Sequence, residues 1–424
     1  MANNLTSNTV EDLARIFLDN FEASRVVTKT VDTQLLQGRY TPRTGGTVSV
    51  KRPHDYNTIR TAGGDISAST KSDILSGKAT GVVQPYFTVA TEWENIEEAL
   101  ELDQLDAILK PMATRIVTDI ELSLARFMMQ QGGLSYGDPD TPVTEWGHVA
   151  GAGALMDSLG VPMDADRCYI MNPFTTVNLA DTQSGLASGD NNLVTTAWQR
   201  AQISTNFGGL RAMTSNALNT ITTEAISDRA GTLAATPDAT YVTHKDTMIQ
   251  SVDVTAFTAS LTVKAGEIIE ITGRNRLNIA TRENALDAAG AQIPWRGVVT
   301  EDVLLDGSGA GTLLVAGPAI NETDGQYNNV DTALTIGDVV TLLGTASTVY
   351  QPNLFYHKQA FGMAGIELPK LYSTDTIGTT EDGFSIRVSK YADGDANTQK
   401  VRFDALCAYV CFNPFFAGQG FGTP

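Results

Sequence analysis

Apolar residues recur along this chain with two different periods, and each period predicts a different kind of element. Between residues 105 and 128 they stand three and four positions apart, the spacing of an amphipathic helix. We expect this helix to continue to Gln131 and to end at Gly132 and Gly133. Pro111 lacks a backbone N–H, so the sequence also predicts a break or kink there.

Two other segments alternate apolar and polar residues with a period of two, which predicts β-strands: TVSVKR at 47–52 and VVQPYFTVATE at 82–92. The residues between them are polar, rich in Gly, Ser and Thr, and short of apolar side chains. A connection of that length without a core of its own is usually functional or flexible. We therefore expect a long two-stranded arm whose tip projects from the body.

Shorter elements precede and follow these. Thr9 can cap a helix from about Val10 to Val27, and Asn172 can cap one that begins at Pro173. A further helix is expected at 191–202 and strands at 167–171 and 208–215, which makes 134–221 a mixed α+β region. Near the C-terminal end, GFSIRVSKY and VRFDALCAYVCF flank a polar turn at 392–398 and predict a hairpin of two long strands.

The segment from about 222 to 348 is β-patterned and rich in Gly, Thr and Val. It contains an internal echo, KAGEIIEI at 264–271 and TIGDVVTL at 335–342, in which a glycine and an acid precede an apolar strand. A hairpin is predicted across Asp306–Gly309. Six or so strands over this length suggest a small barrel or sandwich inserted into the α+β body.

Composition narrows the classes of protein to consider. The chain has 424 residues and a net charge of −19, which excludes a generally basic nucleic-acid binder. Its three cysteines are expected to be free thiols, as in a reducing compartment. We see no signal peptide and no apolar run long enough to cross a membrane.

No motif predicts catalytic, cofactor-binding or metal-binding residues. The four histidines, His54, His148, His244 and His357, share no metal-ligand spacing. The glycines of GAGA at 151–154 and of the C-terminal GQGFG lack the context of a phosphate-binding loop, so we interpret both as flexible backbone. The run at 393–397 resembles the start of a calcium loop but is better explained as a polar turn. An enzyme using His54 and Asp55, or His357, is the rival hypothesis.

Charge is unevenly distributed between the arm and the residues that follow it. The arm carries several basic side chains, whereas the segment from Glu92 onward is acidic. Complementary charges on parts that cannot fold fully onto themselves suggest contact between copies of the chain. The candidate intersubunit contacts are Lys51, Arg52, Arg60 and Lys71 on one side and Glu94, Glu97 and Glu98 on the other.

Several long segments together resemble one protein family. KTVDTQLLQGRY, TGGTVSVKRPHDYNTIRTAGGDIS and LSGKATG resemble the N-terminal arm and extended loop of tailed-phage major coat proteins. EEALELDQLDAILKPMATRIVTDIELSLARFMMQQGG resembles their spine helix, and QPNLFYHKQAF with GFSIRVSKYADGDANTQKVRFDALCAYVCFNPFFAGQGFG their closing segments. The resemblance is greatest to the gene-five coat proteins of short-tailed lambdoid phages, which carry an inserted domain.

The resemblance implies an α+β chain with the Hong Kong 97-type capsid fold. Its parts would be an N-terminal arm at 1–43, an extended loop at 44–92 and a spine helix with peripheral domain at 93–133. The axial domain would occupy 134–221 and 350–375, interrupted by an inserted β-barrel at 222–349. A peripheral C-terminal hairpin would complete the chain at 376–424.

The resemblance also implies a function. Copies of the chain would form pentamers and hexamers and close an icosahedral shell around double-stranded DNA, held together without covalent cross-links and maturing by expansion. A scaffolding protein and a portal protein would be partners, with a decoration protein as a further candidate. The protein would be assembled in the host cytoplasm and end in the virion, with no cofactor and no membrane. The alternative from another class is a β-rich surface adhesin or a decoration protein.

Overall fold

The computed structural model describes residues 25–35, 46–94, 105–182, 207–372, 375–379, 384–393 and 398–423. The chain divides into two compact units. Unit 1 comprises 1–49, 80–125 and 361–410, and unit 2 comprises 50–79, 126–360 and 411–424. Several predictions fall outside the described residues, among them most of the helix at 10–27, the helix at 191–202, Glu97 and Glu98, and residues 394–397 of the turn predicted at 392–398.

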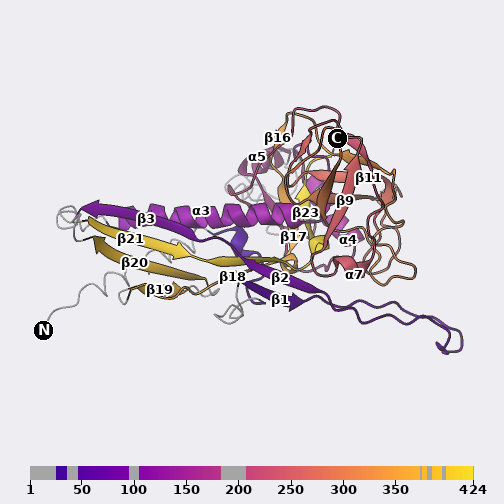
Figure 1. Cartoon of the computed structure of the whole chain (residues 1–424), viewed down its shortest axis with the longest axis horizontal. Helices are drawn as coiled ribbons and strands as arrows, with labels where there is room; N and C mark the ends of the chain where they lie inside the picture. The colour runs from indigo at the N-terminus through magenta and orange to yellow at the C-terminus, as the bar shows by residue number, and fades with distance from the viewer. Residues whose placement is uncertain are drawn as a thin grey trace, which may run out of the picture. The chain divides into compact units, whose positions relative to one another are not determined.

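Unit 1 contains a four-stranded antiparallel sheet in the order β19-β20-β21-β3. Its strands are β3 (Phe87–Glu94), β19 (Thr376–Thr379), β20 (Ser385–Asp393) and β21 (Thr398–Ala405), and they run side by side in Figure 1. The expected hairpin of β20 and β21 is present. However, the predicted long second strand is two strands, because pairing stops at Leu406, whose carbonyl accepts a hydrogen bond from the N–H of Ile366. The chain continues as β22 (Cys407–Cys411) in another sheet.

That second sheet has the order β1-β2-β22-β18, with β1 (Thr47–Lys51), β2 (Lys78–Val83) and β18 (Phe361–Gly365). β1 and β2 are neighbours, so two strands are paired at the base of the predicted arm, but residues 52–77, which connect them, form no strand. The predicted strand at 82–92 is again two strands, β2 and β3, which belong to different sheets. Pro85 lies between them, and a residue without an N–H cannot continue a sheet ladder.

The predicted long helix is α3 (Leu105–Gln131). It ends as expected, with the Gly132 N–H donating to the Met128 carbonyl. Of the break or kink expected at Pro111, the break is wrong, because the helix continues through that residue, and the kink stays a prediction. A proline removes one hydrogen bond, whereas the apolar stripe beyond it is fully buried, with Ile116, Ile120 and Leu124 each at most 1% exposed.

Unit 2 contains a five-stranded mixed sheet in the order β4-β23-β17-β5-β6. The strands are β4 (Leu134–Tyr136), β5 (Arg167–Met171), β6 (Arg211–Thr214), β17 (Asn353–His357) and β23 (Ala417–Gly420). Helices α4 (Trp146–Ser158) and α5 (Pro173–Thr182) accompany the sheet. Asn172 caps α5 as predicted, since its side-chain oxygen accepts the N–H of Phe174 at 2.8 Å.

The two glycine-rich runs interpreted as flexible are ordered elements, so that interpretation is wrong. GAGA lies inside α4, and GQG lies in the buried strand β23. A Cβ on Gly153 would lie 2.2 Å from the carbonyl oxygen of Gly208, and one on Gly418 would lie 2.4 Å from that of Leu134. These glycines allow two backbones to approach closely.

The predicted insertion forms a closed six-stranded barrel in the order β11-β12-β14-β9-β8-β15. The strands are β8 (Ala230–Leu233), β9 (Ile249–Thr255), β11 (Ile268–Asn275), β12 (Pro294–Val299), β14 (Gly311–Ala316) and β15 (Val339–Leu342). Trp295, Leu313 and Val315 are among the fully buried residues of its core. The sequence left barrel and sandwich open, and the structure has the barrel.

The internal echo has a structural counterpart in this barrel. The strands that begin within the two motifs, β11 and β15, are antiparallel neighbours. Gly266 and Gly337 both have positive φ, of 94° and 88°. The acid after each glycine accepts the N–H three residues before it, Glu267 from Lys264 at 2.9 Å and Asp338 from Thr335 at 2.8 Å. The same turn therefore begins both strands.

Short elements complete the described chain. They are η1 (Val27–Lys29), β7 (Ile221–Thr222), α7 (Tyr241–His244), β10 (Thr262–Val263), β13 (Val303–Leu304), β16 (Val349–Tyr350), η4 (Lys358–Ala360) and η5 (Pro414–Phe416). Strands β7 and β16 lead into and out of the barrel, and Thr222 pairs directly with Val349.

Candidate functional site

The extended loop, residues 44–92, presents three of its four predicted basic residues to solvent. Lys51 and Arg60 are exposed. Lys71 is also exposed, but its Nζ donates to the carbonyls of Ile66 at 2.9 Å and Ser67 at 3.2 Å, so it fastens the tip of the loop to itself.

Arg52 differs from the other three because its side chain is buried in its own chain. Its guanidinium donates to the carbonyls of Phe412, Cys411 and Asp246, all within unit 2. Burial lowers the pKa of this guanidinium. In this conformation, Arg52 therefore contacts its own subunit, and its contact with a neighbour stays a prediction.

The predicted acidic partners cannot be placed. Glu97 and Glu98 lie outside the described residues, as does the side chain of Glu94, which ends β3. Nearby, Glu92 pairs with Lys400 of the adjacent strand at 3.2 Å. The proposed pairing of basic loop and acidic segment between copies stays a prediction.

Sequence reasoning missed an apolar component of the extended loop. Tyr56, Ile66 and Ile74 are exposed by 54%, 43% and 77%. Large apolar side chains on a thin projecting loop have no core to join, and such surfaces often mark interaction sites. The available signal was the presence of these side chains in an otherwise polar segment.

In unit 1, the side chain of Glu121 anchors the described part of the N-terminal segment. The buried carboxylate of Glu121, on α3, accepts the backbone N–H groups of Val26, Val27 and Thr28 at 3.0, 2.8 and 2.9 Å. It also accepts the Thr28 hydroxyl at 2.7 Å. Hydrogen bonds to a charged acceptor are stronger than neutral ones, so this end of the segment is fixed to the helix.

The groups considered for enzyme chemistry have structural partners. His357 is fully buried, with Nε2 2.8 Å from a carboxylate oxygen of Asp164 and Nδ1 accepting the N–H of Gln359. His54 contacts the carbonyl of Leu75 through Nδ1 at 2.9 Å. Burial raises the pKa of Cys168 to about 11 and that of Cys407 to about 12, so both thiols are unreactive.

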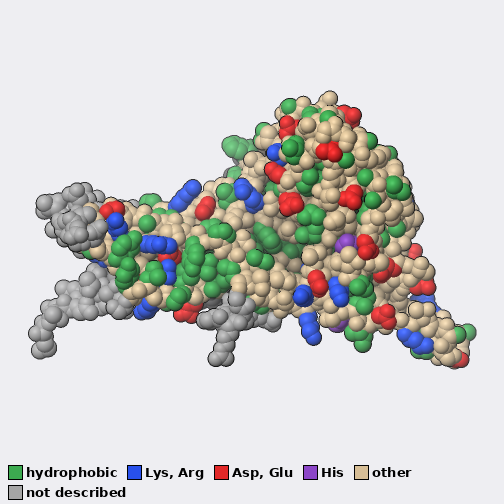
Figure 2. Space-filling model, in the orientation of Figure 1, with side chains coloured by type: hydrophobic (Ala, Val, Ile, Leu, Met, Phe, Trp, Pro, Cys, Tyr) green, Lys and Arg blue, Asp and Glu red, His purple; other side chains and the backbone are tan. Residues whose placement is uncertain are grey.

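The described residues contain no group of three or more His, Cys, Asp or Glu side chains placed to hold a metal ion. Among the helices that are described, none is long and apolar enough to cross a membrane. On the face drawn in Figure 2, acidic side chains are dispersed around the barrel strands of Figure 1.

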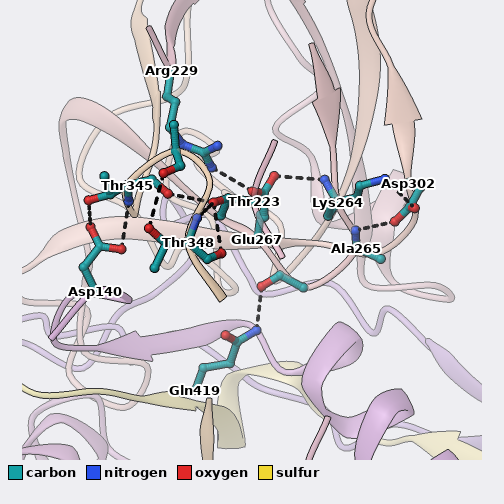
Figure 3. A network of polar contacts seen from close by, with 12 residues as sticks. Asp140, Thr223, Arg229, Lys264, Ala265, Glu267, Asp302, Thr345, Thr348 and Gln419 are labelled. Carbon is teal, nitrogen blue, oxygen red and sulfur yellow. Dashed lines mark hydrogen bonds and ion pairs between the residues drawn. The ribbon is translucent and has the colours of Figure 1, made fainter. Parts of the chain in front are cut away.

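A polar network surrounds the two connections that enter and leave the barrel (Figure 3). Thr223 of the first connection donates to the carbonyl of Thr345 in the second at 2.7 Å. Glu267, which is fully buried, pairs with Arg229 at 2.7 Å. Asp140, from the mixed-sheet region, accepts the N–H of Thr345 at 2.8 Å. The first two contacts lie within the inserted segment, whereas the hydrogen bond from Thr345 to Asp140 links that segment to the rest of unit 2.

Comparisons with known proteins agree on one family. The sequence matches the family described as P22 coat protein, gene protein 5, over residues 1–422. It is 44% identical, over the whole of both chains, to the major capsid protein of Acyrthosiphon pisum secondary endosymbiont phage 1.

The solved structures that match are more distant in sequence. The structure from Mycobacterium phage Che8 is 12% identical, with a TM-score of 0.46 over 93% of this chain and 90% of its own. The mature capsid of bacteriophage PhiM1 is 9% identical, with a TM-score of 0.42 over 91% and 82%.

Proposed function

Since the chain belongs to the P22 coat protein family and is a major capsid protein of a tailed-phage head, we propose that it builds that shell as pentamers and hexamers on an icosahedral lattice. It is a structural component of the virion and not an enzyme. The family matches residues 1–422, so no separate region of the chain is left for the alternative function as an adhesin or decoration protein.

The extended loop is the element proposed to reach a neighbouring subunit. Its exposed basic and apolar side chains support this role, because a charged rim around apolar anchors is a common composition of protein interfaces. Lys51, Arg60 and Lys71 are the candidate contacts. Arg52 is a fourth candidate, which would contact a neighbour only after the loop changes conformation. Glu94, Glu97 and Glu98 are their candidate partners.

The seven-part division of the Hong Kong 97-type fold is proposed on the same basis. Direct pairing of Thr222 with Val349 supports an insertion at 222–349. Within the proposed N-terminal arm at 1–43, the described residues Val26–Thr28 are anchored to Glu121 of the helix.

The shell is proposed to enclose double-stranded DNA without binding its sequence, to assemble with scaffolding and portal proteins, and to expand on maturation without covalent cross-links. A net charge of −19 supports weak interaction with DNA, because phosphate binding needs clustered cations. Loop contacts that are individually weak and non-covalent can rearrange during expansion.

Charge reversal at Arg60 tests the loop contact. Arg60→Glu should reduce the yield of closed shells several-fold when the chain is coexpressed with its scaffolding protein, because the exposed cation would repel an acidic neighbour. Electron microscopy and sedimentation measure the yield. Arg211→Glu, at an exposed position on β6, is the matched control. Equal yields from both variants would contradict the assignment of Arg60.

A further inference from the structure

The root of the extended loop is held by the barrel of the same subunit. We call residues 52–57 and 73–78 the loop root. Within unit 2, three barrel segments contact it: residues 241–248, Arg282, and the stretch 318–329. We call these three segments the cradle.

The cradle holds the first limb of the root through polar contacts. Arg282 forms an ion pair with the carboxylate of Asp55. The hydroxyl of Tyr327 accepts the N–H of Asp55 at 3.3 Å. The side chain of Asn57 donates to the carbonyl of Asp324 at 2.7 Å. The first limb is therefore held at two residues, Asp55 and Asn57.

The second limb is held independently. The side-chain amide of Gln326 donates to the carbonyl of Asp73 at 2.7 Å, and Asp246 accepts the N–H of Lys78 at 3.1 Å. Leu75 packs against a small apolar cluster that includes Tyr241. A Cβ on Gly77 would lie 2.6 Å from the carbonyl oxygen of Lys245, so the backbones approach as closely as glycine allows.

Arg282 is itself held in an unusual conformation. Its φ of 61° lies in the left-handed region, which is unfavourable for a residue with a side chain. Its guanidinium is fixed by the carbonyls of Asn328 and Gln326 as well as by Asp55. The strained backbone of Arg282 and the two carbonyls that bind its guanidinium together place this cation against the Asp55 carboxylate. Such strain indicates a specific role for Arg282 in positioning the loop root.

Beyond the root, the loop makes contacts with itself. Ser72 accepts the N–H of Asn57 at 2.8 Å, and Lys71 holds the carbonyls of Ile66 and Ser67. A two-stranded arm of this kind has little stability of its own, so its direction depends on how its root is held. The contacts that decide that direction lie in the cradle.

We propose that Arg282, Gln326 and Tyr327 are positioning residues for assembly: they set the direction in which the extended loop leaves its own subunit, before the loop meets a neighbour. This inference rests on the proposed function of the loop as an intersubunit contact. It gives the inserted barrel a role in shell geometry that is separate from its own folding.

The test uses the unassembled full-length subunit and the variant Arg282→Ala. Arg60 and Lys71 are exposed trypsin sites within the loop. Loss of the ion pair, one side of which is half-exposed, should raise the initial rate of tryptic cleavage at these sites on the order of fivefold. Asp55→Asn should raise it similarly from the loop side.

Arg274→Ala is the matched control. Arg274 belongs to the same barrel and also has one ion pair, to Asp338, with a similar side-chain exposure of 18%. It contacts Thr332, Thr335 and Asp338 and no residue of the loop root. We expect it to lower the melting temperature of the subunit while leaving cleavage at Arg60 and Lys71 unchanged.

The same variants are then assembled with the scaffolding protein. We expect Arg282→Ala and Asp55→Asn to give more misshapen or open shells than Arg274→Ala. Unchanged cleavage in Arg282→Ala would show that the cradle does not hold the loop root. Arg60→Glu could still block assembly in that case, which would support the loop contact independently. Faster cleavage with normal shells would overturn the positioning role in assembly.

Discussion

At the scale of single residues, buried charges in unit 1 are compensated by specific partners. Asp404 is fully buried in β21, where its carboxylate accepts the Thr88 hydroxyl and Arg387 Nη2, both at 2.6 Å, and Arg402 Nε at 2.7 Å. Burial opposes ionisation of Asp404, but these hydrogen bonds outweigh it and hold its pKa below the usual value.

Asp404→Asn should lower the free energy of unfolding of the unassembled subunit by roughly 3–5 kcal/mol at pH 7, because it leaves the buried cation of Arg387 without its carboxylate. Urea unfolding measures this. Glu92→Gln, which breaks the exposed pair with Lys400 in the same sheet, should cost less than about 1 kcal/mol. Similar losses in the two variants would contradict the importance of burial.

The pH dependence of the same pair has a defined sign. Because the pKa of Asp404 is lower in the folded than in the unfolded chain, its stabilising effect is complete above the unfolded value, near pH 4, and is lost as pH falls through the folded value. The difference between wild type and Asp404→Asn should therefore shrink below about pH 4.

At the scale of elements, a turn with positive φ joins β13 to the barrel strand β14. The turn lies at Asp306–Gly309, as the sequence predicts, and the Gly309 N–H donates to the Asp306 carbonyl at 3.0 Å. The two strands do not form the predicted hairpin, because β13 pairs with β10 and β14 with β9 and β12. Gly309 has a φ of 70°, and a Cβ there would lie 1.8 Å from the carbonyl oxygen of Phe257. The turn therefore needs glycine for two independent reasons.

Gly309→Ala should destabilise the subunit by roughly 2–4 kcal/mol, because the new methyl group adds backbone strain and displaces Phe257. Thermal unfolding followed by circular dichroism measures the loss. Gly307→Ala is the control in the same turn, since its Cβ would meet no atom within 4 Å. If both variants melted alike, the steric argument would fail.

At the scale of the whole molecule, the chain leaves the mixed-sheet region of unit 2, builds a complete barrel and returns. The two crossings are joined to each other by the pairing of β7 with β16, and the buried pair of Arg229 and Glu267 lies inside the barrel. Gln419 of β23 adds another link, donating to the carbonyls of Gly266 at 2.8 Å and Met129 at 3.1 Å. Barrel, helix end and sheet thus share one polar junction.

Arg229→Met tests the buried ion pair inside the barrel. The change leaves Glu267 fully buried without its cation, which should cost roughly 3–5 kcal/mol and accelerate amide exchange in β11. Lys264→Met breaks the exposed pair with Asp302 close by and should cost less than about 1 kcal/mol. Hydrogen exchange with mass spectrometry measures both, and equal exchange would show that the buried pair does not stabilise the barrel.

Much of the local structure was predictable from sequence because it depends on neighbours in the chain. The cap at Asn172, the end of α3 at Gly132 and the repeated turn before β11 and β15 each involve residues within four positions. The basic side chains of the loop were identified as candidates by composition alone. Their exposure and the burial of Arg52 were not predictable, since Arg52 binds residues some 190 and 360 positions away.

The sequence by itself determined the family, the two-stranded arm, the long helix and the six-strand insertion, because periodicity and turn residues are local properties that the chain displays directly. Only the tertiary structure decided that two predicted strands divide between sheets at Pro85 and Leu406, that GAGA and GQG are close-packed, and that the barrel holds the loop root. Each of these depends on atoms far apart in the sequence, such as Asp55 with Arg282 or Gly153 with Gly208, which meet only when the chain has folded.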